Sequence, residues 1–214
     1  KMSMRSMLYY TRYNGKMAYG YEDRSNDTKV FSGDKEESGN ISRVQDIGLK
    51  TDFWWMPAEK HLVRFGASVQ PHFYRAERYA EYSRYVDGNE IPDSTASNGA
   101  KYYGTEFSSY IEDEMKLTGW MSLNAGLRYS AYQTGRKVYH SLEPRAALTF
   151  SVHPSVDIRA SYSEMSQFNH QVSSVYMDLP TNLWMPSTES VRPMRSRQVA
   201  AGVYARLPEN MSLS

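Results

Sequence analysis

The sequence lacks cysteine: none of its 214 residues can form a disulfide or offer a thiolate to a metal or redox centre. It also lacks any apolar run close to the ~20 residues that a membrane-spanning helix needs. Neither sign of charge is in excess, because 25 lysines and arginines face 24 acidic residues. Nucleic-acid-binding proteins usually carry a basic excess or stripe. The sequence therefore argues against thiolate chemistry and against a nucleic-acid partner.

Recognisable catalytic and metal-binding motifs are missing as well. The histidines are scattered over different segments and never stand at metal-ligand spacing; they are His61, His72, His140, His153 and His170. Glu112, Asp113 and Glu114 are adjacent, but neighbouring residues of a strand point to opposite faces and cannot act as an acid–base pair. No nucleophile elbow is present. We expect no enzyme activity, no cofactor and no metal site.

Tyrosine, by contrast, is abundant. The chain has 18 tyrosines, yet its mean hydropathy is only −0.67. Many aromatic residues without general hydrophobicity suit a surface that is half wet and half apolar, as in a transmembrane barrel with a polar lumen. A soluble β-rich domain with tyrosine-rich strands has the same composition.

Alternation with a period of two dominates the chain and predicts β-strands. In Trp120–Tyr132, Met121, Leu123 and Leu127 fall on one face, and polar residues such as Arg128 fall on the other. The polar faces of several such runs carry an arginine in mid-strand. We expect these arginines to face a lumen: Arg64, Arg128, Arg145, Arg159 and Arg206.

The connections between the runs alternate between short and long. Asn14-Gly15 predicts a two-residue hairpin between Met2–Tyr13 and Lys16–Asp23, because a type I′ turn needs two positive φ values. Further short turns are predicted at 57–60, 117–119, 153–155 and 208–210, and longer connections at 24–42, 77–103, 134–138 and 168–196. Short turns at one end of a meander and long loops at the other are typical of outer-membrane barrels.

The predicted fold is therefore all-β: an antiparallel up-and-down meander that forms part of a transmembrane β-barrel. Nine strands and the start of a tenth can be counted, which fits a segment of a larger barrel. Aromatic residues in the predicted long loops are candidates for ligand binding, although they could equally pack the loops together. They are Tyr79, Tyr82, Tyr85, Tyr102, Tyr103, Tyr176 and Trp184.

Four motifs in residues 104–206 resemble the barrel of TonB-dependent receptors, particularly the SusC-like type with a carboxypeptidase-regulatory-like extension. Ser109–Thr118 is similar to the family's Tyr-x-x-Asp-x-(aromatic or Met)-x-Leu-Thr strand. Leu123–Tyr129 resembles its Leu-x-x-Gly-Leu-Arg-Tyr strand, and Leu142–Leu148 resembles its Pro-Arg strand. Ile158–Ser163, with Gln167 close behind, is similar to its (Leu/Ile)-(Arg/Lys)-Ala-Ser-Tyr strand. The four occur in the family's order and spacing.

The resemblance implies a function and a set of partners. Residues 1–214 would be a segment of a receptor barrel in the Gram-negative outer membrane, with the plug domain and the barrel ends outside it. The segment would supply barrel wall and extracellular loops to an importer that binds a small nutrient and is coupled to TonB. Its other partners would be outer-membrane lipid and a surface lipoprotein.

Two other interpretations remain at this stage. A soluble or surface-attached β-sandwich that binds carbohydrate or protein would pack its apolar faces against each other. A passive porin or barrel enzyme would keep the architecture without TonB. The sequence does not distinguish glycan, peptide, haem and siderophore as substrates.

Overall fold

The structure, a computed structural model, describes residues 1–25, 32–86, 89–172, 183–206 and 212–213, which contain strands and no helix. The strands are β1 (Met2–Ser25), β2 (Ser32–Trp55), β3 (His61–Val86), β4 (Asn89–Lys116), β5 (Met121–Thr134), β6 (Lys137–His153), β7 (Val156–Gln167), β8 (Asn169–Val172), β9 (Leu183–Pro186), β10 (Met194–Arg206) and β11 (Ser212–Leu213).

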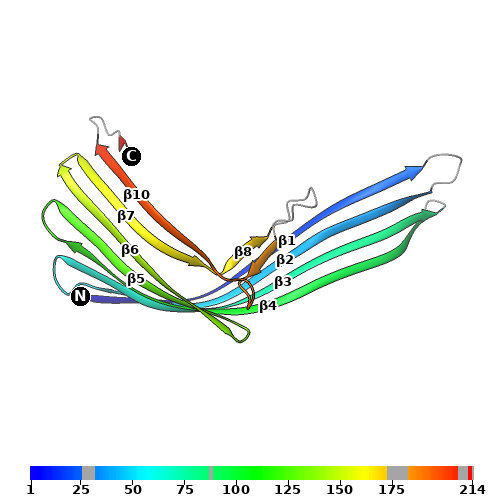
Figure 1. Cartoon of the computed structure of the whole chain (residues 1–214), viewed down its shortest axis with the longest axis horizontal. Coiled ribbons are helices and arrows are strands. Elements are labelled where there is room, and N and C mark those ends of the chain that lie inside the picture. The colour runs from blue at the N-terminus through cyan, green and yellow to red at the C-terminus, as the bar shows by residue number, and fades with distance from the viewer. Residues whose placement is uncertain (26–31, 87–88, 173–182, 207–211, 214) are drawn as a thin grey trace.

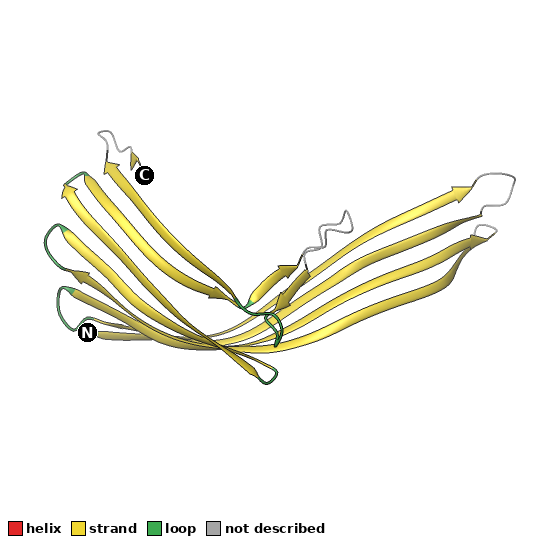
Figure 2. Ribbon diagram, viewed as in Figure 1, coloured by secondary structure: helices red, strands yellow, loops and turns green. Residues whose placement is uncertain are grey.

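The main sheet is a meander in the order β1-β2-β3-β4-β5-β6-β7-β10-β11, and every neighbouring pair is antiparallel. It curls into a trough, and the β8–β9 hairpin lies on its concave side (Figure 1). Figure 2 shows that strands make up nearly all of the described chain. The structure confirms the predicted all-β meander and partial barrel. It does not form the two packed sheets of a sandwich.

The hairpin predicted at Asn14-Gly15 is wrong. Strand β1 runs straight through this dipeptide, where Asn14 pairs with Arg43 and Gly15 pairs with Ser42. Gly15 instead leaves room for the side chain of Tyr13, because a Cβ at position 15 would lie 2.6 Å from its hydroxyl. Pairing with β2 along the whole of β1 outweighs the local turn preference. The two strands predicted on either side of the dipeptide are therefore one.

Two of the predicted long loops are also wrong, because their residues pair as strands. Residues 32–42 belong to β2, and residues 77–86 and 89–103 form a continuous hairpin of β3 and β4. The paired strands β1 to β4 are 24–28 residues long, whereas crossing a membrane takes about 9–11. Their far halves project well past the shorter strands (Figure 1). Near the tip, an ion pair of 3.2 Å joins Lys35 to Glu90 and raises the pKa of the lysine.

The convex face of the sheet is apolar and uncovered. Its exposed side chains include Leu8 (76% exposed), Leu142 (62%) and Val199 (80%). Buried apolar side chains are few among the described residues and gather where the hairpin meets the sheet; they are Tyr74, Ala76, Tyr132, Phe168 and Leu183. A soluble protein rarely leaves so large an apolar surface in water. A lipid-facing wall needs one.

The apolar band ends at one level across the first four strands. On the convex face, Tyr10 of β1, Phe73 of β3 and Tyr103 of β4 are the last residues before a cation interrupts the apolar band: Arg12, Arg75 and Lys101. At the other border lie Trp55 and Trp120, beside the short turns. Aromatic girdles at both edges of an apolar band are a feature of outer-membrane barrels.

The predicted short turns at 57–60, 117–119 and 153–155 lie together at one end of the sheet, beside the N-terminus (Figure 1). The β5–β6 turn lies at the opposite end of those strands and depends on Gly135, whose φ is +55°. A Cβ there would also lie 2.4 Å from Oε1 of Glu189. Glycine alone adopts this conformation without strain.

Candidate functional site

Antiparallel register decides which side chains reach the concave face, because directly paired residues point to the same side. Thr11 pairs with Asp46, and Asp46 pairs with His72. Farther along the sheet Arg128 pairs with Glu143. The same alternation that sends apolar residues outward therefore collects ionisable side chains on the inside.

An aspartate–histidine pair marks the β2–β3 part of this face. Nδ1 of His72 lies 2.8 Å from Oδ1 of Asp46, and Thr11 donates to Oδ2 of the same carboxylate at 3.1 Å. His72 is buried, and its Nε2 has no hydrogen-bond partner among the residues that the structure describes. The pair fixes the orientation of the imidazole within the wall.

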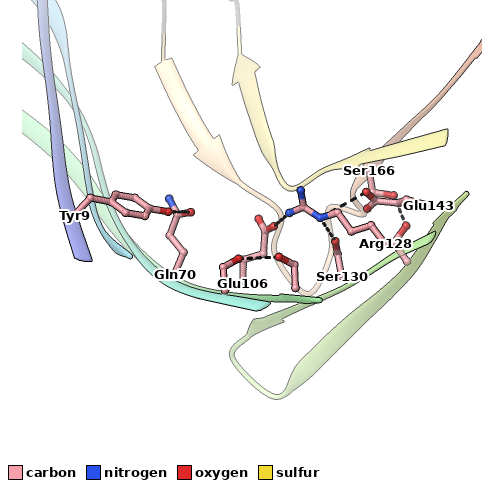
Figure 3. Close-up of polar contacts among 10 residues, drawn as sticks. Tyr9, Gln70, Glu106, Arg128, Ser130, Glu143 and Ser166 are labelled. Carbon is pink, nitrogen blue, oxygen red and sulfur yellow. Dashed lines mark hydrogen bonds and ion pairs between the residues drawn. The ribbon is translucent and has the colours of Figure 1, made fainter. Parts of the chain in front are cut away.

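A second cluster centres on Arg128 (Figure 3). Its Nη2 donates to Oε1 of Glu106 at 2.9 Å, its Nε donates to Oγ of Ser130 at 3.2 Å, and its Nε lies 3.9 Å from Oε2 of Glu143. Glu143 is buried, so its carboxylate depends on this cation for compensation. One guanidinium thus ties β4, β5 and β6 together.

Tyrosines lie across glycines on neighbouring strands of the concave face. Tyr9 reaches Gln70 over Gly48, with its hydroxyl 2.8 Å from Oε1 of the glutamine (Figure 3). Tyr132 covers Gly104 in the same way. Sequence analysis missed these pairs, and the available signal was glycine in mid-strand, which marks close approach of another group.

The Gly104 contact makes a testable prediction. A Cβ at position 104 would lie 2.0 Å from Oη of Tyr132, so Gly104→Ala should displace that ring and lower the free energy of unfolding by about 1–3 kcal/mol. Gly99→Ala on the same strand is the control, because its Cβ would meet its nearest neighbour at an ordinary 3.4 Å. Equal urea midpoints for the two variants would contradict the packing described.

The β8–β9 hairpin docks on the concave face through both of its strands. Phe168, just before β8, stacks on Tyr132 with ring centroids 4.8 Å apart, and Tyr74 donates a hydrogen bond to Asn169. From β9, the backbone N–H of Trp184 donates to Oγ of Ser42 at 3.2 Å. The hairpin therefore occupies part of the space that the trough encloses.

Residues that follow β9 close the base of the hairpin. The N–H of Ser187 donates to the carbonyl of Phe168 at 2.6 Å, and its hydroxyl lies 2.9 Å from Nε2 of His170. Tyr139 of β6 donates to the carbonyl of Thr188 at 2.7 Å. Burial lowers the pKa of His170 below its ordinary value, which favours the neutral ring in this contact.

The five arginines predicted to face a lumen lie on the concave face. Arg64 contacts Glu112 at 3.2 Å and Glu114, and Arg128 holds the cluster described above. Arg145 of β6, Arg159 of β7 and Arg206 of β10 lie on the side of their strands that carries no apolar band. Arg159 stands 4.3 Å from the ring centroid of Tyr204, within a cavity of about 680 Å³ that Arg206 also lines.

The aromatic candidates are placed differently from the prediction. Tyr79, Tyr82, Tyr85, Tyr102 and Tyr103 belong to strands β3 and β4, not to loops, because the polar residues around them pair as a hairpin. Tyr79 bonds Glu37 at 3.0 Å on the convex side, and Tyr103 packs on Phe73 at the edge of the apolar band. Tyr102 lies beside Tyr74 on the concave face. Trp184 lies in β9, and Tyr176 lies outside the described residues.

The described ranges contain no group of three or more histidine, cysteine, aspartate or glutamate side chains that could hold a metal ion. Across the same residues, no helix is long and apolar enough to span a membrane. The arrangement on the concave face can bind and guide a polar solute through hydrogen bonds and charge.

Residues 3–210 match the family described as TonB dependent receptor-like, beta-barrel. The chain belongs to this family of TonB-dependent receptor barrels. The match confirms the resemblance seen in the motifs and extends it over the first half of the chain. The TonB-dependent receptor family consists of transporters of the Gram-negative outer membrane rather than enzymes, which places this chain in that membrane.

The solved structures that this chain resembles are distant from it in sequence. The alcaligin outer membrane receptor FauA from Bordetella pertussis is 13% identical with a TM-score of 0.34, and the match covers 97% of this chain and 41% of that one. The siderophore receptor PirA from Acinetobacter baumannii is 9% identical with a TM-score of 0.36, covering 97% and 51%. The ferric enterobactin receptor PfeA from Pseudomonas aeruginosa is 9% identical with a TM-score of 0.37, covering 95% and 51%.

This TonB-dependent receptor segment thus spans about half the length of those receptors or less. No curated protein matches the sequence. Family membership rests on the match of residues 3–210 to the family of TonB-dependent receptor barrels.

Proposed function

We propose that this chain forms part of the wall and of the ligand path of an energy-coupled nutrient importer. The observation that carries the proposal is the two-sided sheet of a TonB-dependent receptor barrel: an uncovered apolar convex face opposite a concave face of paired charges. Lipid covers the first face, and the second borders the lumen. The segment contributes binding and passage, without covalent chemistry.

The arginines of the concave face fall into two groups, one ion-paired between carboxylates and one exposed. Arg64 and Arg128 are each held between two carboxylates and keep the wall rigid. Arg145, Arg159 and Arg206 are exposed, and the last two line the cavity near the short turns. Exposed guanidinium groups suit carboxylate or phosphate groups of a passing solute.

Aromatic contact with ligand is proposed for the residues that face the trough. Tyr82 and Tyr102 lie on the inner side of β3 and β4, and Trp184 projects from the hairpin that narrows the space. Tyr79, Tyr85 and Tyr103 lie on the opposite side of the sheet. A large ligand that passes the hairpin would contact Tyr82, Tyr102 and Trp184. Aromatic rings suit such contacts because they offer a large contact area at low entropic cost.

The remaining partners follow from family membership. TonB would act on a plug domain outside these residues and open a route beside the hairpin. A surface lipoprotein of the kind that accompanies SusC-like receptors would contact the projecting halves of β1 to β4. The short turns would then face the periplasm and the long strands the exterior.

Energy-dependent uptake tests the function. A strain that produces the full-length receptor should accumulate one member of a labelled panel of ferric siderophore, haem, peptide and glycan, and a strain without the gene should not. A protonophore should abolish the accumulation, because TonB draws its energy from the inner membrane. Accumulation that survives the protonophore would identify a passive pore instead.

A further inference from the structure

Strands β6 and β7 pair along only part of their length. Their ladder ends at the pair of Arg145 with Ser163. The residue of β6 beyond this pair is Pro144, which has no backbone N–H to donate to a ladder. From there to the β5–β6 turn, residues 137–144 pair with β5 alone among the described strands, and residues 164–167 of β7 pair with β10 alone. The wall therefore contains a gap between these two segments, called the window below (Figure 1).

The window is closed at both of its ends. At one end lies the ladder of β6 and β7. At the other end, the segment that follows β9 lies against β6: Tyr139 donates to the carbonyl of Thr188 at 2.7 Å, and Lys137 donates to the carbonyl of Glu189 at 3.1 Å. The window therefore leads sideways through the wall and not along the strands into the water beyond their tips.

Two side-chain contacts cross the window in place of a backbone ladder. Oγ of Ser141 lies 2.6 Å from Oγ of Ser166. Nη2 of Arg195 reaches from β10 across the end of β7 and donates to the carbonyl of His140 at 3.4 Å, which is long for a hydrogen bond. A ladder over the same length would hold the strands through several backbone hydrogen bonds. The window is therefore the weakest part of the boundary between β6 and β7.

Cavities flank the window on both faces of the sheet. One, of about 350 Å³, is lined by Leu142 of the apolar convex face. The other, of about 410 Å³, is lined by Tyr139 and Phe168 on the side of the trough. The residues that line both cavities are Ser141, Ser166 and Arg195. The two cavities therefore meet in the window and form one passage through the wall, interrupted by the two crossing contacts.

The passage suits a ligand with one hydrocarbon chain and an acidic end. A molecule that enters from the convex face must dissolve in lipid, because that face is apolar. Cavities of a few hundred Å³ hold one drug-sized molecule, which excludes a lipid with several acyl chains. Arg192 lines the cavity on the side of the trough and has no ion pair among the described residues. A guanidinium group binds a carboxylate through two parallel hydrogen bonds.

We propose that the window is a lateral portal through which a long-chain fatty acid passes between the surrounding lipid and the lumen. Its carboxylate contacts Arg192, and its chain displaces the contacts of Ser141 with Ser166 and of Arg195 with His140. The portal rests on the proposed function in one respect, the assignment of lipid to the convex face and of the lumen to the concave face. It needs no TonB, so an experiment in vesicles and the uptake experiment can fail independently.

Photolabelling of the full-length receptor in lipid vesicles tests the portal. The probe is a long-chain fatty acid with a photoreactive diazirine on its chain, and mass spectrometry identifies the labelled residues after irradiation. Wild type should be labelled at Leu142 on the lipid side and at Phe168 on the lumen side, since these residues line the two ends of the passage. Labelling of Leu142 without labelling of Phe168 would overturn the proposal.

A disulfide across the window distinguishes passage from contact with the surface. Ser141→Cys/Ser166→Cys places two sulfurs where the hydroxyl oxygens are 2.6 Å apart. When oxidised, this variant should lose labelling of Phe168 and keep labelling of Leu142. Reduction should restore the labelling of Phe168, which also shows that the variant is folded. Undiminished labelling of Phe168 in the oxidised variant would mean that the fatty acid reaches the lumen by another path, and would overturn the proposal.

The matched control is a disulfide within the ladder of the same two strands. Ala147 pairs directly with Ser161, so Ala147→Cys/Ser161→Cys joins β6 to β7 where they are already joined. This variant should be labelled as wild type is, whether oxidised or reduced. A loss of Phe168 labelling in the oxidised control as large as in Ser141→Cys/Ser166→Cys would contradict a path through the window.

A further arm tests the acidic end of the ligand. Arg192→Gln should lower the labelling of Phe168 by the fatty acid about tenfold, because a charge-assisted pair of hydrogen bonds is lost. The alcohol of the same chain length, with the same diazirine, should label Phe168 weakly and to the same extent in wild type and Arg192→Gln. Equal labelling of wild type by the acid and by the alcohol would overturn the assignment of a fatty acid.

Discussion

Replacing Arg128 with methionine is expected to lower the free energy of unfolding by about 3 kcal/mol, because removing one partner of a buried ion pair strands the other charge. Here one cation serves two carboxylates, Glu106 at 2.9 Å and Glu143 at 3.9 Å. The side chain of Glu143 is only 6% exposed, so water cannot replace the lost guanidinium. Urea unfolding of the receptor in lipid vesicles measures the change.

Two companion variants separate charge from packing. Arg128→Met combined with Glu143→Gln should recover part of the loss, because the most buried charge is then removed with its partner. Arg159→Met should cost less than about 1 kcal/mol, since its pair with Asp157 is largely exposed. A loss for Arg159→Met as large as that for Arg128→Met would show that burial does not set the energetics of this face.

An arginine placed on the convex face should be nearly as damaging. Ala160 lies in the middle of the apolar face of β7, between Ile158 and Tyr162. Ala160→Arg is expected to destabilise the barrel by about 2–4 kcal/mol, the cost of a cation near the bilayer midplane. In water the same substitution of an exposed alanine would have almost no effect.

The adjacent residue provides the control. Ser161 is also small and exposed but points to the concave face, where it pairs with Ala147 and Ala200. Ser161→Arg should change the free energy of unfolding by less than about 0.5 kcal/mol. Equal effects of the two arginines in vesicles would mean that both faces meet the same solvent.

Much of the fold could be predicted because alternation and turns are local properties. The face of each side chain in Trp120–Tyr132 follows from the pleat alone. The short turns at 117–119 and 153–155 follow from the breaks between alternating runs. The turn predicted at Asn14-Gly15 was wrong because turn preference is a local property. Pairing with β2 along the whole of β1 keeps this dipeptide in a strand.

Strand length and the interior contacts could not be predicted. Residues 89–100 are mostly polar and small, and they are held in a strand by pairing with residues 76–86. The docking of Phe168 on Tyr132 joins residues that are far apart in sequence, and no periodicity encodes it. The tyrosine–glycine pairs could have been suspected from glycines in mid-strand, such as Gly48 and Gly104.

The most direct test of the two-sided wall uses the absence of cysteine from these 214 residues. A single cysteine is introduced at position 160 or at position 161 of the receptor and labelled with a polarity-sensitive fluorophore in lipid vesicles. We expect the label at 160 to emit as in hydrocarbon and to be quenched by brominated lipid, and the label at 161 to be quenched by aqueous iodide. Iodide quenching of both labels, with no effect of brominated lipid on either, would contradict a lipid-facing convex surface.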